Sequence, residues 1–163
     1  MPQSIESEPD ATALDKDLAT ARQDPNIKWI VAFYHRPIYT SPSAHSPDEA
    51  GIKTVVVPLF DKYHVDMVLQ AHNHNYQRSY PLKANIITDN GADSIYQNPK
   101  GTIYIVVGTG GQENHSLNGQ ASYIQNQFTN IHGFLKIDVS DNNLKGTFFA
   151  NDGTIKDTFA IKK

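Results

Sequence analysis

The chain has 163 residues, 39% of them hydrophobic, so it is long enough to bury one hydrophobic core. The sequence contains no cysteine, which excludes disulfides, thiolate metal sites and thiol nucleophiles among these residues. The net charge is −3, from 14 basic and 17 acidic side chains, and no basic stripe that would bind a nucleic-acid backbone is visible. The apolar runs are far shorter than the roughly 18 residues of a membrane span. The sequence therefore predicts no nucleic-acid or membrane partner, and it leaves the cellular compartment unknown.

The first predicted elements are a tail and a helix. Residues 1–12 are polar and contain prolines, which predicts a flexible tail ahead of a folded part over residues 13–163. Leu14 and Leu18 lie one turn apart on a shared face among good helix formers. This spacing predicts a short amphipathic helix over residues 11–23.

A strand, a helix and a second strand are predicted next. Residues 29–34 form a continuous apolar run of strand length, which is typical of a strand covered on both faces. Apolar residues at helical spacing over 52–63 predict a helix that is kinked at Pro58 or restarts there, because proline removes a backbone donor. Residues 65–69 are again apolar and predict a strand. This order indicates a βαβ unit with parallel pairing.

The rest of the chain is predicted to be rich in strands. Residues 79–100 are polar and indicate an excursion over the surface, and residues 102–107 read as a third apolar strand. Residues 134–139, 144–150 and 154–161 are separated by turn residues and predict three further strands. The fold class is therefore α/β with a β-rich C-terminus.

Three of the seven histidines follow predicted strands directly. His35 ends the first strand, and His72 and His74 come just after the second, at the strand ends where open α/β sheets bind ligands. On extended backbone His72 and His74 would project from the same side. With His35 they would offer three neutral nitrogen ligands suited to zinc, iron or manganese. Spacing alone leaves open that these are surface or packing histidines.

Two stretches around these histidines resemble a known enzyme family. Residues 31–37, Val-Ala-Phe-Tyr-His-Arg-Pro, and residues 69–78, Leu-Gln-Ala-His-Asn-His-Asn-Tyr-Gln-Arg, are similar to the last two motifs of the calcineurin-like metallophosphoesterases, nearest the purple acid phosphatase branch. The segment 58–66 resembles the family's connecting helix. The resemblance implies the C-terminal half of the family's αββα sandwich, with a mixed sheet and a short helix before and between the first strands.

The resemblance also implies a reaction and roles for residues. In that family two metal ions bridged by an aspartate hydrolyse a phosphate ester, so the implied activity is that of an acid-phosphatase-like phosphoric ester hydrolase. By motif, His35 and His72 would ligate one ion (Fe, Zn or Mn) and His74 the other. His45 resembles family histidines that contact the substrate phosphate and protonate the leaving alcohol, although a solvated loop histidine is the alternative. Arg78 is a candidate phosphate ligand, with a structural ion pair as the alternative.

The sequence departs from the family pattern in one large respect and one small one. An aspartate after the first strand, a bridging aspartate and an Asn-His pair are absent from these residues, and Ala71 replaces a usual glycine. The chain therefore resembles a partial metallophosphoesterase domain that lacks the N-terminal metal-ligand motifs. We expect at most one metal ion, because two dications held by neutral imidazoles repel each other, and weak or no phosphatase activity by the chain alone.

Two kinds of partner and two other functions stay open. An N-terminal half domain would complete the site, or the chain would self-associate through an exposed apolar sheet edge along residues 29–34. The other functions are a non-catalytic module that binds a metal or a partner, and a hydrolase with one ion held by three histidines.

The remaining candidate residues carry weaker signals. The glycine-rich residues 108–111 lack the lysine and hydroxyl of a nucleotide P-loop and predict a tight turn at the rim of the site. His115 and His132 have no spaced partners and are expected at the surface or in packing. Tyr76 and Tyr80 either line a pocket or pack against the core.

Overall fold

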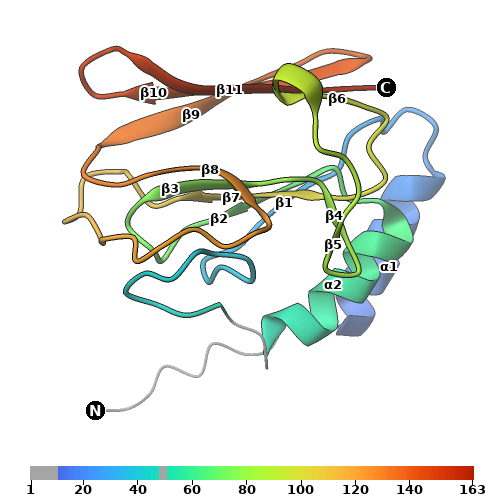
Figure 1. Ribbon diagram of the computed structural model, residues 1–163. Coiled ribbons are helices and arrows are strands. Elements are labelled where there is room, and N and C mark those ends of the chain that lie inside the picture. The colour runs from blue at the N-terminus through green and yellow to red at the C-terminus, as the bar shows by residue number, and fades with distance from the viewer. Residues whose placement is uncertain (1–10, 48–50) are drawn as a thin grey trace.

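The computed structural model describes residues 11–47 and 51–163 and arranges them in three layers (Figure 1). Two helices cover one face of a central five-stranded sheet, and a four-stranded sheet packs on its other face. The mixed sheets, the few helices and the strand-rich C-terminal region confirm the predicted α/β fold class.

The central sheet holds the βαβ unit. Its strands are β1 (Val31–Phe33), β2 (Met67–Gln70), β7 (Ile103–Val107), β3 (Tyr76–Ser79) and β8 (Ile124–Phe128), in that spatial order. β1 pairs in parallel with β2, and β2 in parallel with β7. β3 is antiparallel to both of its neighbours, β7 and β8. The parallel pairing predicted for the first two strands is confirmed.

The helices are α1 (Ala11–Gln23) and α2 (Ile52–Tyr63). Both were expected from the spacing of their apolar residues, and Leu18 of α1 and Phe60 of α2 are buried in one core with the central sheet. The predicted tail lies outside the described residues up to residue 10, and the next two residues already belong to α1. No helix in the described ranges is long and apolar enough to cross a membrane.

Helix α2 is a single helix through Pro58, so the predicted restart is wrong. Pro58 lies on an exposed position of the helix, where its missing N–H leaves only one intrahelical bond unmade. His64 ends the helix in the left-handed conformation, with φ 51°, and its backbone N–H donates to Phe60 O. Arg22 of α1 donates from Nε to Tyr63 O at 2.8 Å and from a guanidinium nitrogen to His64 O at 2.6 Å. The open carbonyls at the end of α2 are thus paired.

The second sheet contains the three C-terminal strands that were predicted. It has the order β6-β11-β10-β9, with antiparallel pairs between β9, β10 and β11 and a parallel pair between β11 and β6. The bounds of its strands are β6 Ile95–Gln97, β9 Gly133–Val139, β10 Asn143–Ala150 and β11 Ile155–Lys162. Between β3 and β6 lie a small hairpin and one turn of 3-10 helix, namely β4 (Leu82–Lys83), β5 (Ile86–Ile87) and η1 (Ala92–Ser94).

Successive residues of the central strands point into two separate cores. Met67, Ile103 and Ile105 pack with the second sheet, whereas Val68 and Tyr104 pack with the helices. Side chains alternate between the faces of a strand, so a strand covered on both faces needs apolar residues at every position. This explains the continuous apolar runs of β2 and β7.

Strand β1 does not have this double cover. Within the described residues β1 pairs with β2 alone and forms the edge of the central sheet. Phe33 is 82% exposed and Val31 is 38% exposed. The prediction of a strand covered on both faces is therefore wrong for β1, because an open groove separates Phe33 from Leu135 of the second sheet.

Residues 79–100 are more structured than the predicted surface excursion, since they include β4, β5, η1 and β6. The strands β3 and β8 were not predicted at all. Their sequences, Tyr-Gln-Arg-Ser and Ile-Gln-Asn-Gln-Phe, contain more polar than apolar residues. All four residues of β3 are nevertheless buried, because their polar groups find partners inside the protein.

Candidate histidine site

The candidate site lies at the C-terminal ends of the three parallel strands. His35 follows β1, His72 and His74 follow β2, and the loop with His115 follows β7. Parallel strands end at the same edge of a sheet, which brings these loops together. The loop after His35 brings His45 to the same place.

His35 and His72 form a close pair. Nε2 of His35 lies 3.0 Å from Nδ1 of His72, and the ring centroids are 4.9 Å apart. Two imidazole nitrogens that bind one tetrahedral ion at ~2.0–2.1 Å lie about 3.3 Å apart. The backbone supports the approach, because Ala71 N donates to His35 O at 3.0 Å. The 3.0 Å separation is that of a hydrogen bond between the two rings, and it is only slightly shorter than the separation of two ligands on one ion.

His74 belongs to a second pair, with His115. The two rings are stacked with centroids 3.9 Å apart, and His74 N donates to Nδ1 of His115 at 3.1 Å. Nδ1 of His74 lies 2.8 Å from Glu113 O, so the ring donates there and leaves Nε2 as its acceptor. A histidine that donates to a backbone carbonyl in this way is oriented as metal-binding histidines commonly are.

The three predicted ligands do not form one group. Among the described residues, no set of three or more His, Asp or Glu side chains is arranged to hold one metal ion. The expectation that His72 and His74 project from the same side required extended backbone. Instead His72 has φ 62°, and two tight turns follow, with Asn73 N donating to Ala71 O and Asn75 N to Asn73 O. After these turns, the His74 ring stacks on His115.

His45 connects the two pairs. Its ring is stacked on His72 with centroids 3.8 Å apart, and it meets His115 edge to face at 5.3 Å. His115, which was expected at the surface or in packing, is part of this cluster. Its position after β7, the third parallel strand, was the signal that points to the site. Burial lowers the pKa of His115, and the charges of His74 and His45 lower it further, which favours the neutral imidazole.

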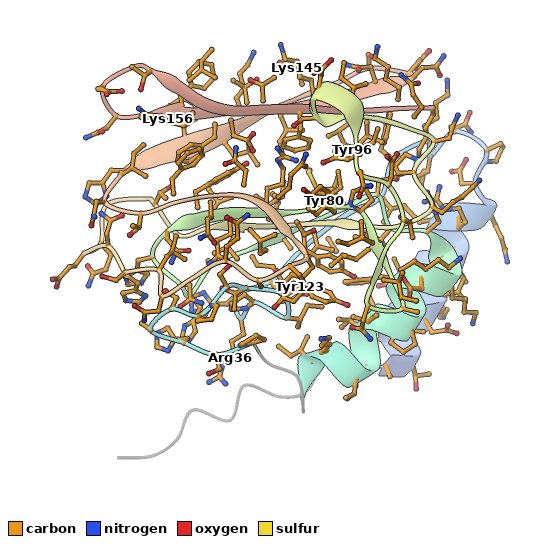
Figure 2. All side chains as sticks on the ribbon, viewed as in Figure 1. Arg36, Tyr80, Tyr96, Tyr123, Lys145 and Lys156 are labelled. Carbon is orange, nitrogen blue, oxygen red and sulfur yellow. The ribbon has the colours of Figure 1, made fainter. Side chains whose placement is uncertain are left out.

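A polar cavity of about 360 Å³ opens beside this cluster. His45 and His72 line it together with Arg36, whose side chain points out from the loop after β1 (Figure 2). Arg36 was not singled out from the sequence, although a cation directly after His35 is a signal for anion binding. A guanidinium beside imidazoles gives this cavity the donors that a phosphate group needs.

Arg78 lies elsewhere, between the two sheets. Its side chain is 1% exposed and pairs with Asp157 at 2.6 Å and 2.9 Å, and it also donates to Tyr96 Oη. Tyr76 is buried beside this ion pair and donates to Asp157 at 2.7 Å. A guanidinium enclosed in this way does not line the cavity beside His45 and His72. Its geometry is that of the structural ion pair considered as the alternative.

The glycine-rich turn of residues 108–111 lies at the rim, as expected. Gly108 N donates to Asn75 O at 3.0 Å. A Cβ atom on Gly108 would lie 2.0 Å from Asn73 O. Glycine is needed here because the two backbones are in contact.

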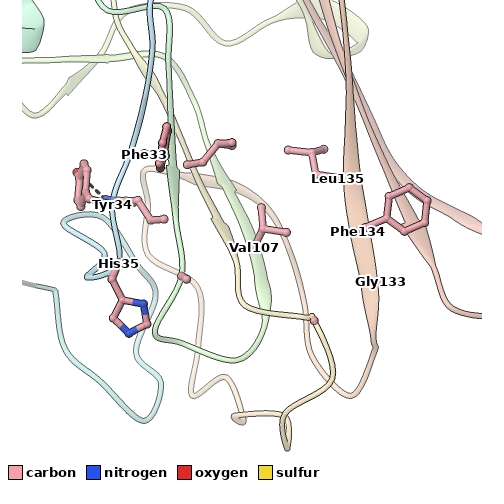
Figure 3. A pocket seen from close by; sticks show the side chains of 11 residues that line it. Phe33, Tyr34, His35, Val107, Gly133, Phe134 and Leu135 are labelled. Carbon is pink, nitrogen blue, oxygen red and sulfur yellow. Dashed lines mark hydrogen bonds between the residues drawn. The ribbon is translucent and has the colours of Figure 1, made fainter.

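An apolar groove of about 620 Å³ runs from His35 between the two sheets. Figure 3 shows Phe33 and Val107 on its central-sheet side and Leu135 of β9 facing them. Phe134, also on β9, is 60% exposed. The groove therefore lies between two edge strands, β1 of the central sheet and β9 of the second sheet.

Sequence comparison relates the chain to acid phosphatases. Residues 101–158 match the family model described as Iron/zinc purple acid phosphatase-like protein C. An acid phosphatase of Aspergillus ficuum is 31% identical over 162 residues, which cover 92% of this chain and 26% of that protein. Acid phosphatase type 7 of Homo sapiens is 31% identical over 111 residues, which cover 61% of this chain and 25% of that protein.

Structure comparison gives the same relationship. The purple acid phosphatase PPD1 from yellow lupin (Lupinus luteus) seeds superposes with a TM-score of 0.83 at 25% identity, over 96% of this chain and 28% of that chain. This chain spans about a quarter of the length of these relatives. In sequence and in fold, it is similar to the C-terminal part of purple acid phosphatase-like metallophosphoesterases.

Proposed function

We propose that this chain supplies the C-terminal metal ligands of a metal-dependent phosphoric ester hydrolase of the acid-phosphatase type. His35 and His72 would hold one ion (Fe, Zn or Mn), and His74 would contribute to a second. The observation that carries this proposal is the 3.0 Å approach of His35 Nε2 and His72 Nδ1 at the shared strand ends. A bound ion polarises phosphoryl oxygens and lowers the pKa of water.

The residues around the cavity suit a phosphate ester substrate. Arg36 would bind phosphate oxygens through its guanidinium. His45, half-buried and stacked on His72, would contact the phosphate and give a proton to the leaving alcohol. Both side chains line the same cavity, which supports their action on one substrate group.

On its own, the chain is expected to bind at most one ion and to turn over substrate weakly or not at all. These residues lack the bridging aspartate and the Asn-His pair of the family pattern. Without a bridging carboxylate, two neighbouring dications repel each other. Residues 13–163 would then act as a partial domain that needs the N-terminal ligands from another segment.

Metal binding by the purified chain tests this proposal. Isothermal titration with Zn²⁺ should give about one weak site, and His35→Ala or His72→Ala should lower the affinity by about 10-fold or more. His132→Ala serves as the control, because in the described part of the chain the His132 ring does not contact the rings of the cluster. The proposal fails if the two ligand variants bind Zn²⁺ like the wild type. Robust metal-dependent hydrolysis of p-nitrophenyl phosphate by the chain alone would contradict the expected inactivity.

A second candidate function is a non-catalytic module that binds a partner polypeptide. The exposed Phe33 on the edge strand β1 and the apolar groove beside it favour this candidate. Co-expression with a polypeptide that carries the aspartate and Asn-His motifs distinguishes the two. Phosphatase activity in the complex supports the hydrolase, whereas a stable complex that binds metal without turnover supports the binding module.

A further inference from the structure

Three buried amide side chains occupy every second position after His72. Asn73, Asn75 and Gln77 are each 0% exposed, and we call them the amide ladder. Their side chains bond to the loop of residues 40–45, which ends at His45. The same short segment thus presents imidazoles to the site and amides to the loop.

Asn73 binds the backbone of His45 on both sides. Its Oδ1 accepts from His45 N at 3.0 Å, and its Nδ2 donates to His45 O at 2.9 Å. Nδ2 also donates to Thr40 Oγ1 at 3.0 Å. One side chain therefore satisfies both main-chain polar groups of His45, as a neighbouring strand would.

Gln77 and Asn75 extend these contacts. Gln77 accepts from Ser41 N at 2.5 Å and donates to Asn75 Oδ1 at 2.8 Å. Asn75 Nδ2 donates to Ser43 Oγ at 3.0 Å and to His115 O at 3.4 Å. The amide ladder thereby connects the His45 loop to the segment that carries His115.

The loop has no regular secondary structure of its own to fix His45. Residues 38–47 form bends rather than a helix or strand, yet Thr40 and Ser41 are buried. Buried backbone groups need partners. The amide ladder bonds Ser41 N and both backbone groups of His45, whereas Tyr123 Oη donates to Thr40 O. The position of His45 is thus set by bonds to the segment that carries His72 and His74.

We propose that Asn73 is a positioning residue that holds His45 stacked on His72. Asn73 acts through the backbone of His45, so it fixes where the imidazole stands and leaves its ring nitrogens available for chemistry. The functional meaning of this placement rests on the proposed function, in which His45 contacts the substrate phosphate beside the ion. The placement itself is a property of the metal-free chain.

Imidazole NMR of the metal-free chain at pH 8 tests the proposal, since stacked rings shift each other's ring protons. In Asn73→Ala we expect the ring-current shifts of His45 and His72 to fall to less than half of their wild-type size. The shifts of the His74–His115 stack should be kept. Asn126→Ala is the matched control, because its amide donates to Asp157 between the sheets and should leave all four rings unchanged.

Two results would overturn the proposal. One is a folded Asn73→Ala protein with unchanged His45 and His72 shifts. The other is an equal loss in both stacks, which would make Asn73 a general structural residue. If Asn73→Ala does not fold, Asn73→Asp replaces it in the test. The aspartate keeps the acceptor for His45 N and loses the Nδ2 donor to His45 O and Thr40 Oγ1, so the His45 shifts should be intermediate. Unchanged His45 shifts in Asn73→Asp would also overturn the proposal. Absence of Zn²⁺ binding by the wild type would refute the proposed function and leave this inference standing.

Discussion

At the scale of single residues, the site depends on backbone contacts that only particular side chains allow. Gly108 touches the carbonyl of Asn73, and His72 adopts a left-handed conformation with φ 62°. The non-glycine residue at φ > 0 costs energy that the surrounding structure has to offset. The hydrogen bonds of Asn73 to the His45 loop provide such compensation.

Gly108→Ala should destabilise the protein by about 1–3 kcal/mol, because its Cβ has to displace the Asn73 carbonyl. That Cβ would lie 2.0 Å from Asn73 O. Gly110→Ala is the control, since a Cβ there would meet no atom within 4 Å. Urea unfolding of the two variants measures the difference. Equal stability of the two variants would show that the backbone contact at Gly108 is relaxed in solution.

At the scale of elements, the end of α2 shows how a helix ends without glycine. His64 holds the left-handed position with φ 51°, and Arg22 donates to the last carbonyls. The imidazole of His64 also lies 3.9 Å from Asp66 Oδ1, a carboxylate that pairs with Lys163 at 2.6 Å. Burial lowers the pKa of His64 despite this carboxylate, so the neutral form is favoured.

His64→Gly should be more stable than His64→Ala by ~1 kcal/mol, because only glycine adopts the left-handed conformation without a steric cost. Both variants lose the imidazole, so the difference between their stabilities measures the steric cost of the left-handed backbone. Thermal unfolding followed by circular dichroism gives this comparison. Indistinguishable melting temperatures would mean that the helix end rearranges once the imidazole is removed.

At the scale of the whole molecule, one buried ion pair joins the two sheets. Arg78 comes from β3 of the central sheet and Asp157 from β11 of the second. Burial raises the pKa of Asp157, but the hydrogen bonds and charge of Arg78 outweigh it and hold the pKa below its ordinary value. Asp157 is therefore more readily ionised in the folded chain than in the unfolded chain.

The Arg78–Asp157 pair should make the free energy of unfolding decrease as the pH falls in the acidic range. A depressed carboxyl pKa contributes stability above the unfolded pKa of about 3.9 and loses it as pH falls through the lower folded value. Asp157→Asn should lower the free energy of unfolding by about 3–5 kcal/mol at neutral pH, because Arg78 stays buried without its charged partner. Below about pH 4, the variant should lose less stability than the wild type does. Asp138→Asn, which breaks the exposed Lys136 pair, should cost ~1 kcal/mol or less. Guanidinium unfolding at several pH values measures both. A comparable loss of stability in Asp157→Asn and Asp138→Asn would contradict the expectation that the buried pair contributes more than the exposed one.

The open edge of the central sheet also belongs to the whole molecule. β1 is short and apolar, and an unpaired edge of this kind favours association with another strand. We expect concentration-dependent self-association of the chain, which Phe33→Lys should weaken by about 10-fold or more. Ile86→Lys removes a comparably exposed apolar residue, 67% exposed, from the small β4–β5 hairpin and should leave association unchanged. Sedimentation velocity provides the test, and a wild type that stays monomeric at high concentration contradicts the expectation.

Local sequence determined much of the framework of this protein. The apolar spacing of α1 and α2 and the apolar runs in β2 and β7 follow from how helices and strands bury apolar faces. The turn residues between the last three strands marked where those strands end. The motifs around His35 and His72 indicated the resemblance to purple acid phosphatases, which the similarity to known acid phosphatases supports. These features can be read because each depends on residues close together in the chain.

Only the tertiary structure decided which polar residues act together. His115 joins His74 and Asn73 binds His45, across separations of 41 and 28 residues. β3 was missed because its polar side chains are buried against partners from distant segments. The exposure of Phe33 on β1 depends on the open groove between β1 and β9. Such pairings arise from loops that meet at the ends of parallel strands, and no periodicity along the chain encodes which loops will meet.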